Sequence, residues 1–110
     1  MLNRDNISVS GTHAMRFLDD INIDIAFIVP SGASAQTGLT CGNYSECELK
    51  KMIVEKARKI IVLLDTSKLD KSLPYTFCAL ENVSAIVTNG PLPGDIEDIA
   101  DKNGVRIIRA

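Results

Sequence analysis

The chain contains little of what marks several specialised classes of protein. It has no tryptophan, one histidine (His13) and only 5% aromatic residues among its 110 residues. No apolar run approaches the roughly 18 residues of a transmembrane helix, and residues 1–11 lack the apolar core of a secretory signal peptide. These absences predict a protein that does not span a membrane and has no membrane partner.

Neither sign of charge is in large excess. The 12 Lys and Arg residues and the 14 Asp and Glu residues give a net charge of −2. A domain that binds nucleic acid directly usually carries a basic patch. We therefore expect no direct contact with DNA or RNA. The 45% hydrophobic and 24% charged residues are typical of one folded globular domain.

Cysteine is also scarce, being limited to Cys41, Cys47 and Cys78. An odd number without a C-x-x-C pair does not predict a disulfide framework, and His13 lies too far away to complete a zinc site. We expect reduced thiols, a cytoplasmic location and no metal. Cys47 fits a helical pattern and should serve packing, whereas Cys41 lies in a glycine-flanked loop that leaves exposure open.

Apolar runs separated by amphipathic stretches predict alternating strands and helices. Strands are expected at residues 23–29, 59–64, 83–88 and 105–108, with a weaker edge strand or turn at 74–80. The run at 23–29 is continuous enough to suggest burial on both faces, as in a parallel sheet. The order predicts an α/β domain with a mainly parallel sheet.

Two helices follow from spacing and capping residues. In the first, Ser45 and Glu48 form a capping box, and apolar residues recur at Leu49, Met52, Ile53, Ala57 and Ile60. Its charged pairs, Glu46 with Lys50 and Glu55 with Lys59, are expected on a solvated outer face. The second helix, near residues 95–103, has acidic residues in its first turn and ends at Gly104.

The N-terminal part predicts a short strand at residues 7–9 and a helix capped by Ser10. This helix presents one apolar face at spacing i, i+3, i+4 and i+7, made by Ala14, Phe17, Leu18 and Ile21. His13 lies beside that face. Because no carboxylate or nucleophile is placed near it, we expect a surface or packing histidine rather than a catalytic one.

Polar residues follow three of the predicted strands, at residues 30–32, 65–68 and 88–90. In α/β folds, ligands bind outside the carboxyl ends of the strands. Lys68 with neighbouring hydroxyl groups and glycine amides suits a phosphate, and Asp65 suits sugar hydroxyls. The equally weighted alternative is a local turn formed by Asp65 and Ser67, with a solvated Lys68.

The stretch at residues 33–45 is predicted to be a loop rich in small and hydroxyl residues. Gly32, Gly38 and Gly42 would allow its backbone to approach a ligand closely. A plain surface loop is the alternative.

Six short motifs occur in a fixed order along the chain: DIAFIVPSG (24–32), GLT (38–40), the helix start from Glu46 to Lys50, LLDTSK (63–68), AIVTN (85–89) and GVRII (104–108). Together they resemble the C-terminal sensor domain of DeoR-family bacterial transcription regulators. The resemblance covers nearly the whole chain, and the ordered set is specific where no single motif is.

The resemblance implies a Rossmann-like α/β fold, a mainly parallel sheet flanked by helices, related to sugar-phosphate isomerases. It implies that residues 1–110 are a partial effector-sensing domain, without the N-terminal helix-turn-helix and the first part of the sensor domain. Such a domain binds a phosphorylated sugar or related metabolite and reaches DNA only through the missing helix-turn-helix. No cofactor is implied, and we expect a homo-oligomer because missing strands would leave an open sheet edge.

Carried over by position, the resemblance implies a ligand site with Asp65, Ser67 and Lys68 in the pocket and Gly32, Gly38 and Thr40 in its wall. Asn89 departs from the family pattern, in which an Asp is common at this position. Asn89 is expected to lie beside the implied ligand site.

Other functions fit the residues less well. A related isomerase needs a carboxylate base near the sugar carbon, but no Asp or Glu occurs between Asp24 and Glu46, and Lys50 and Lys51 fall where those enzymes resemble Glu-Lys. A phosphoacceptor receiver domain needs an acidic pair for Mg²⁺, which residues 30–32 do not supply. We therefore expect a binding role and not an enzyme, with a vestigial interaction or oligomerisation domain as the remaining alternative.

Overall fold

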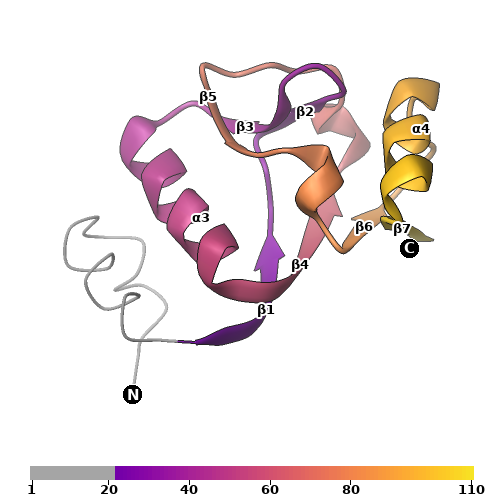
Figure 1. Cartoon of the computed structure of the whole chain (residues 1–110). Helices are drawn as coiled ribbons and strands as arrows, with labels where there is room; N and C mark the ends of the chain where they lie inside the picture. The colour runs from indigo at the N-terminus through magenta and orange to yellow at the C-terminus, as the bar shows by residue number, and fades with distance from the viewer. Residues whose placement is uncertain (1–21) are drawn as a thin grey trace.

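The computed structural model describes residues 22–110. Its centre is a parallel sheet of four strands, and Figure 1 shows how the other elements lie around this sheet. The strands are β1 (Ile23–Ile28), β4 (Ala57–Leu64), β6 (Ala85–Thr88) and β7 (Arg106–Arg109), in the order β1-β4-β6-β7. Every neighbouring pair is parallel, which confirms the predicted α/β fold. The strand predicted at residues 7–9, the helix around residues 14–21 and His13 lie outside the described residues.

The loop prediction for residues 33–45 is wrong. Most of this stretch forms a hairpin of β2 (Gly32–Ser34) and β3 (Gly38–Cys41), to which β5 (Tyr75–Cys78) adds a third antiparallel strand. Every residue of β2 and β3 is buried. The small side chains that suggested a loop are therefore those that let the hairpin pack closely. Strand β5 confirms the weak strand predicted at residues 74–80.

Helix α3 (Tyr44–Lys56) lies beside β1 and β5, and helix α4 (Gly94–Asn103) lies beside β7 (Figure 1). The 3-10 turn η1 (Thr66–Lys68) follows β4, and a second 3-10 turn, η2 (Leu80–Asn82), precedes β6. Helix α4 ends as predicted, because Gly104 adopts the left-handed conformation of a C-cap, with φ 71°. No helix between residues 22 and 110 is long and apolar enough to cross a membrane.

Helix α3 begins earlier than its sequence suggested. Its N-cap is Asn43, whose Oδ1 accepts a hydrogen bond from the Glu46 backbone N–H at 3.0 Å. The predicted capping box is wrong, since Ser45 and Glu48 both lie inside the helix. The predicted ion pair between Glu46 and Lys50 is confirmed, at 3.1 Å.

Helix α3 also ends earlier than its apolar spacing suggested. Strand β4 starts at Ala57, which pairs with Ile23 of β1. Long-range strand pairing therefore overrides the helical spacing that included Ala57 and Ile60. The predicted pair of Glu55 and Lys59 is wrong as well, because Lys59 now belongs to the strand.

The hydrophobic core lies on one face of the parallel sheet. Its buried strand residues are Ala26, Ile28, Ile60, Val62, Leu64 and Ile86. They form one cluster with Cys47 of α3, Ile96 and Ala100 of α4, and Leu39 of β3. Both helices and the hairpin therefore cover the same face.

The other face of the sheet is open in the described part of the chain. Phe27 is 64% exposed and Ile25 is 47% exposed, whereas Ala26 and Ile28 between and beyond them are buried. Alternation explains this contrast, since successive side chains of a strand point to opposite faces. The prediction that residues 23–29 are buried on both faces is therefore wrong for residues 22–110.

The turn of the hairpin gives a first prediction. Gly38 has a φ of 80°, and a Cβ there would lie 2.6 Å from the Cys78 carbonyl oxygen. We expect Gly38→Ala to lower the free energy of unfolding by more than the ~1–2 kcal/mol of left-handed strain, because the clash adds to it. Urea denaturation followed by circular dichroism measures the change. Gly42→Ala is the matched control, since its Cβ meets nothing within 4 Å; equal losses in both variants would contradict this role of Gly38.

Candidate functional site

The carboxyl ends of β4 and β6 bring polar residues into contact. Asp65 follows β4 directly, and Asn89 follows β6. The Asp65 Oδ1 accepts hydrogen bonds from the Ser67 backbone N–H at 3.0 Å and from the Asn89 Nδ2 at 3.4 Å. The Asn89 Oδ1 accepts one from the Thr66 backbone N–H at 3.0 Å. We call residues 65–68 and Asn89 the polar rim.

The hydrogen bonds of the polar rim favour the ionised form of Asp65. The bond from the Ser67 backbone lowers the pKa of Asp65 most, followed by the Ser67 side chain and Asn89. Lys68 adds a smaller attraction and makes no ion pair within residues 22–110. The polar rim therefore presents a carboxylate near a partly buried lysine that forms no ion pair with the carboxylates of the described residues.

Asp65 also has a structural role. Its bond to Ser67 caps the turn η1, so the local turn that the sequence allowed as an alternative is present. The hydrogen bonds from the Ser67 backbone N–H and from the Asn89 Nδ2 both end on one carboxylate oxygen of Asp65, Oδ1. A carboxylate offers about four acceptor positions. Capping the turn therefore leaves acceptor capacity for the hydroxyl group of a ligand.

Two of the predicted wall residues pack the hairpin. Gly32 pairs with Thr40 in the ladder of β2 and β3, and a Cβ on Gly32 would lie 2.6 Å from the Lys71 carbonyl oxygen. The Thr40 side chain is fully buried, and its Oγ1 accepts a hydrogen bond from the Leu73 backbone N–H at 3.1 Å. These contacts hold the hairpin against the segment that follows the polar rim.

Backbone pairing joins the hairpin to the polar rim. Ala33 of β2 forms a bridge with Leu69, and its carbonyl accepts a hydrogen bond from the Asp70 N–H at 2.9 Å. The chain therefore runs from Lys68 directly along β2. Gly38, the third wall residue, lies at the turn end of the hairpin, where it lines a small hollow of about 130 Å³.

Lys50 is a further candidate site residue, which its sequence pattern did not indicate. Its Nζ donates a hydrogen bond to the Val29 carbonyl at 3.0 Å and lies 5.1 Å from the centre of the Phe77 ring. Only 17% of the side chain is exposed, so the expectation of a solvated outer face is wrong for this residue. Val29 follows β1, which places this cation at the same edge of the sheet as Asp65.

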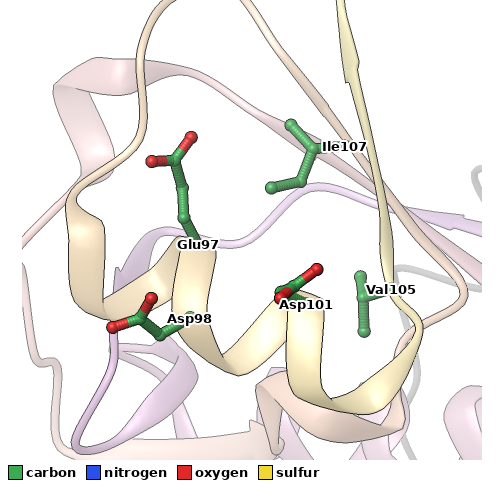
Figure 2. Close-up of a pocket in the computed structure, with 5 residues that line it drawn as sticks. All are labelled: Glu97, Asp98, Asp101, Val105 and Ile107. Atoms are coloured by element: carbon green, nitrogen blue, oxygen red, sulfur yellow. The ribbon is translucent and has the colours of Figure 1, made fainter.

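The hollow in Figure 2 belongs to a different part of the fold. It measures about 370 Å³ and is lined by three residues of α4, by one residue just before β7 and by one residue of β7: Glu97, Asp98, Asp101, Val105 and Ile107. Three carboxylates repel an anion. This hollow therefore does not suit a phosphorylated ligand.

The three cysteines are free and buried, so Cys41 is not exposed although its loop position left this open, and the packing role of Cys47 is confirmed. Burial raises the pKa of the Cys41 thiol and raises that of Cys78 to about 11. Such thiols stay protonated and are poor nucleophiles. Between residues 22 and 110, no three His, Cys, Asp or Glu side chains are grouped as a metal site.

Comparison with known proteins gives matches along nearly the whole chain. The family model of the DeoR C-terminal sensor domain matches residues 1–90. The HTH-type transcriptional regulator GlpR of Haloferax volcanii is 30% identical over 107 residues, and the HTH-type transcriptional regulator IolR of Bacillus subtilis is 33% identical over 104 residues. These alignments cover 97% and 94% of this chain but only 42% and 41% of the two relatives.

A putative aga operon transcriptional repressor of Escherichia coli is 26% identical over 107 residues, which is 97% of this chain and 40% of that protein. The chain therefore spans about two fifths of the length of the curated relatives that it matches. All three names describe regulators of transcription.

The contact between Asn89 and Asp65 gives a second prediction. An aspartate cannot donate the hydrogen bond that Asn89 donates, so Asn89→Asp replaces it with repulsion between two carboxylates. We expect this variant to melt below the wild type at pH 7. The contacts that lower the pKa of Asp65 stabilise the fold at pH values above the pKa of this group in the unfolded chain, and this stabilisation is lost as the pH falls. The difference in melting temperature between the variant and the wild type should therefore shrink below about pH 4, where carboxylates become protonated.

Melting curves at pH 7 and in acid measure this effect. Asn82→Asp is the control, since it adds the same charge at an exposed position before β6, at the opposite edge of the sheet. Equal losses of melting temperature in both variants at pH 7 would contradict the specific contact.

Proposed function

Because this chain belongs to the DeoR family of transcriptional regulators and matches its C-terminal sensor domain, we propose that it binds a phosphorylated sugar or related metabolite for a regulator of sugar metabolism. The polar rim supports the proposal, since it gathers an ionised Asp65, the Ser67 hydroxyl and the ammonium group of Lys68 at one edge of the sheet. Ligands of open α/β folds bind at this edge.

Each residue of the proposed site has a role that its chemistry suits. Lys68 contacts the phosphate or another anionic group. Asp65 orients sugar hydroxyls with the acceptor capacity that its capping bond leaves, and Ser67 supplies a further hydrogen bond. Lys50, which is paired with Glu46, holds the Val29 carbonyl on the β1 side of the edge.

Gly32, Gly38 and Thr40 contribute to the wall of the proposed pocket through the hairpin. The burial of Thr40 and the tight fit of Gly32 favour an indirect role, in which these residues hold β2 beside the chain that leaves Lys68. The bridge between Ala33 and Leu69 is the contact that would transmit this support.

In the whole protein, we propose that residues 1–110 belong to the effector-sensing domain and that DNA is bound by a helix-turn-helix outside them. The relatives named above as HTH-type regulators and the net charge of −2 support a sensing role. Strand β1 has no partner on its outer edge among the described residues, which supports self-association. The proposed location is the cytoplasm.

We propose binding without catalysis. A sugar-phosphate isomerase needs a base whose pKa lies near the working pH, whereas the hydrogen bonds of the polar rim lower the pKa of Asp65. In a coupled assay with pentose phosphates, the chain should show no isomerisation above that of Asp65→Asn. Turnover that disappears in this variant would make the chain an enzyme.

Binding itself is measured as a rise in melting temperature with ligand. A ligand at about 100 times its dissociation constant adds roughly 2.7 kcal/mol to the free energy of unfolding. We expect at least one phosphorylated sugar to stabilise the wild-type chain. Lys68→Ala should remove most of this rise, because the lysine supplies the charge that holds the phosphate, while the melting temperature without ligand should change little.

Two comparisons sharpen this experiment. Lys102→Ala removes an exposed lysine in the last turn of α4 and should respond to ligand as the wild type does. Inorganic phosphate and unphosphorylated sugars separate recognition of the anion from recognition of the sugar. If no phosphorylated sugar stabilises the chain, effector binding by the polar rim is wrong and an interaction or oligomerisation domain is favoured.

A further inference from the structure

Ser31 is a polar residue at the carboxyl edge of the sheet that has no part in the proposed site. It follows the end of β1, and its side chain is partly exposed. Within residues 22–110, its Oγ forms no hydrogen bond. A hydroxyl group donates one hydrogen bond and accepts two, so the hydrogen-bonding capacity of Ser31 is available to a ligand.

The backbone around this hydroxyl group is held on both sides. The Lys50 Nζ donates a hydrogen bond to the Val29 carbonyl oxygen at 3.0 Å, and Pro30 is fully buried. The Ser31 N–H donates a hydrogen bond to the Thr40 carbonyl oxygen at 3.1 Å. A side chain on a backbone held in this way is suited to a binding site, because its position is set before the ligand arrives.

The strand pairing places Ser31 beside the polar rim. Ile28 of β1 is level with Val62 of β4. Further along the two chains, Ala33 forms a parallel bridge with Leu69. Ser31 lies between these two paired positions and therefore runs alongside residues 65–68. Neighbouring strands of a sheet are roughly 4.8 Å apart, which sets the scale of the gap between Ser31 and the polar rim.

The side chains of Ser31 and Asp65 belong to the same face of the sheet. Phe27 and Val29 are exposed on the open face, and alternation along the chain gives Ser31 the same side. Leu63 of β4 is also exposed on that face, and alternation gives Asp65 that side as well. A serine hydroxyl without a partner and a carboxylate therefore lie on one side of two adjacent strand ends.

We propose that Ser31 is a further ligand-binding residue, and that Ser31 and Asp65 together hold two neighbouring hydroxyl groups of the sugar. This inference rests on the proposed function and defines its ligand more closely, as a phosphorylated sugar with a vicinal diol. Lys68 keeps its role at the phosphate.

The two side chains have complementary hydrogen-bonding properties. A carboxylate such as Asp65 only accepts hydrogen bonds, whereas the Ser31 hydroxyl both donates and accepts. One sugar hydroxyl donates to Asp65, and the hydroxyl on the next carbon bonds to Ser31. Hydrogen bonds between two oxygens are roughly 2.7 Å long, which suits hydroxyl groups held between adjacent strands. Loss of one such bond should weaken binding roughly 3- to 10-fold.

Isothermal titration calorimetry on the whole 110-residue chain tests the choice of ligand. The probes are ribose 5-phosphate, glucose 6-phosphate and the 2-deoxy analogue of each. We expect the wild type to bind at least one of the two complete sugars roughly 3- to 10-fold more tightly than its 2-deoxy analogue. Equal affinities within both pairs overturn the diol. No saturable binding of any of the four overturns this inference together with the proposed function.

A matched pair of variants tests the residue. Ser31→Ala should weaken binding of the preferred sugar phosphate roughly 3- to 10-fold, yet leave the melting temperature without ligand unchanged, because the hydroxyl group has no partner among the described residues. Ser45→Ala is the control, since Ser45 is exposed and lies two residues before the buried Cys47, on the opposite side of α3. Unchanged affinity in Ser31→Ala, with binding still lost in Lys68→Ala, overturns this inference and leaves the proposed function standing.

Chemical protection gives a second measurement that does not depend on a small change in affinity. The cysteines of the chain are buried, so iodoacetamide should label Ser31→Cys mainly at the introduced thiol. We expect a saturating sugar phosphate to slow this labelling several-fold and to leave the labelling of Ser45→Cys unchanged. Equal labelling rates of Ser31→Cys with and without a sugar phosphate that binds this variant would overturn the proposal.

Discussion

Parallel pairing of β1, β4 and β6 is the constraint on which the rest of the molecule depends. Because these strands point the same way, their carboxyl ends share one edge of the sheet. That edge carries Asp65 after β4, Asn89 after β6 and the Val29 carbonyl after β1. Polar residues that are far apart in the sequence therefore meet at one edge of the sheet, next to the hydrophobic core.

The polar rim has a structural role and also retains unused hydrogen-bond acceptor positions on Asp65. Asp65 caps η1 and is held by Asn89, a residue that suits this place because it can donate to one neighbour and accept from another. The same bonds lower the pKa of the carboxyl group, and a carboxylate with a lowered pKa is a weak base for proton abstraction. The proposed sensing role depends on this arrangement.

Much of the fold could be predicted from local patterns. Strands β4, β6 and β7 lie where continuous apolar runs occur, and α4 ends at the glycine that its sequence places there. The errors have long-range causes. Helix α3 stops where Ala57 meets Ile23 of β1, and the hairpin was missed because its small residues lack the β-branched signature of strands.

The candidate site also has residues that could be predicted from the sequence and residues that could not. Alignment of Asp65 and Asn89 on one edge followed from the parallel sheet, since each ends an apolar run. The position of Lys50 did not, because its spacing from Glu46 predicts the ion pair and says nothing of Val29 or Phe77, which are 21 and 27 residues away in the sequence. Burial of a lysine by contacts this distant in the sequence leaves no local pattern.

The most direct test of the central claim follows the backbone amide signals of the wild-type chain during titration with phosphorylated sugars. Binding at the polar rim predicts that the signals of Ser67, Lys68 and Asn89 move together and saturate, while those of α4 stay in place. Saturating changes confined to α4 and β7, or no saturating change anywhere in the spectrum, would contradict a metabolite site at the carboxyl edge of the sheet.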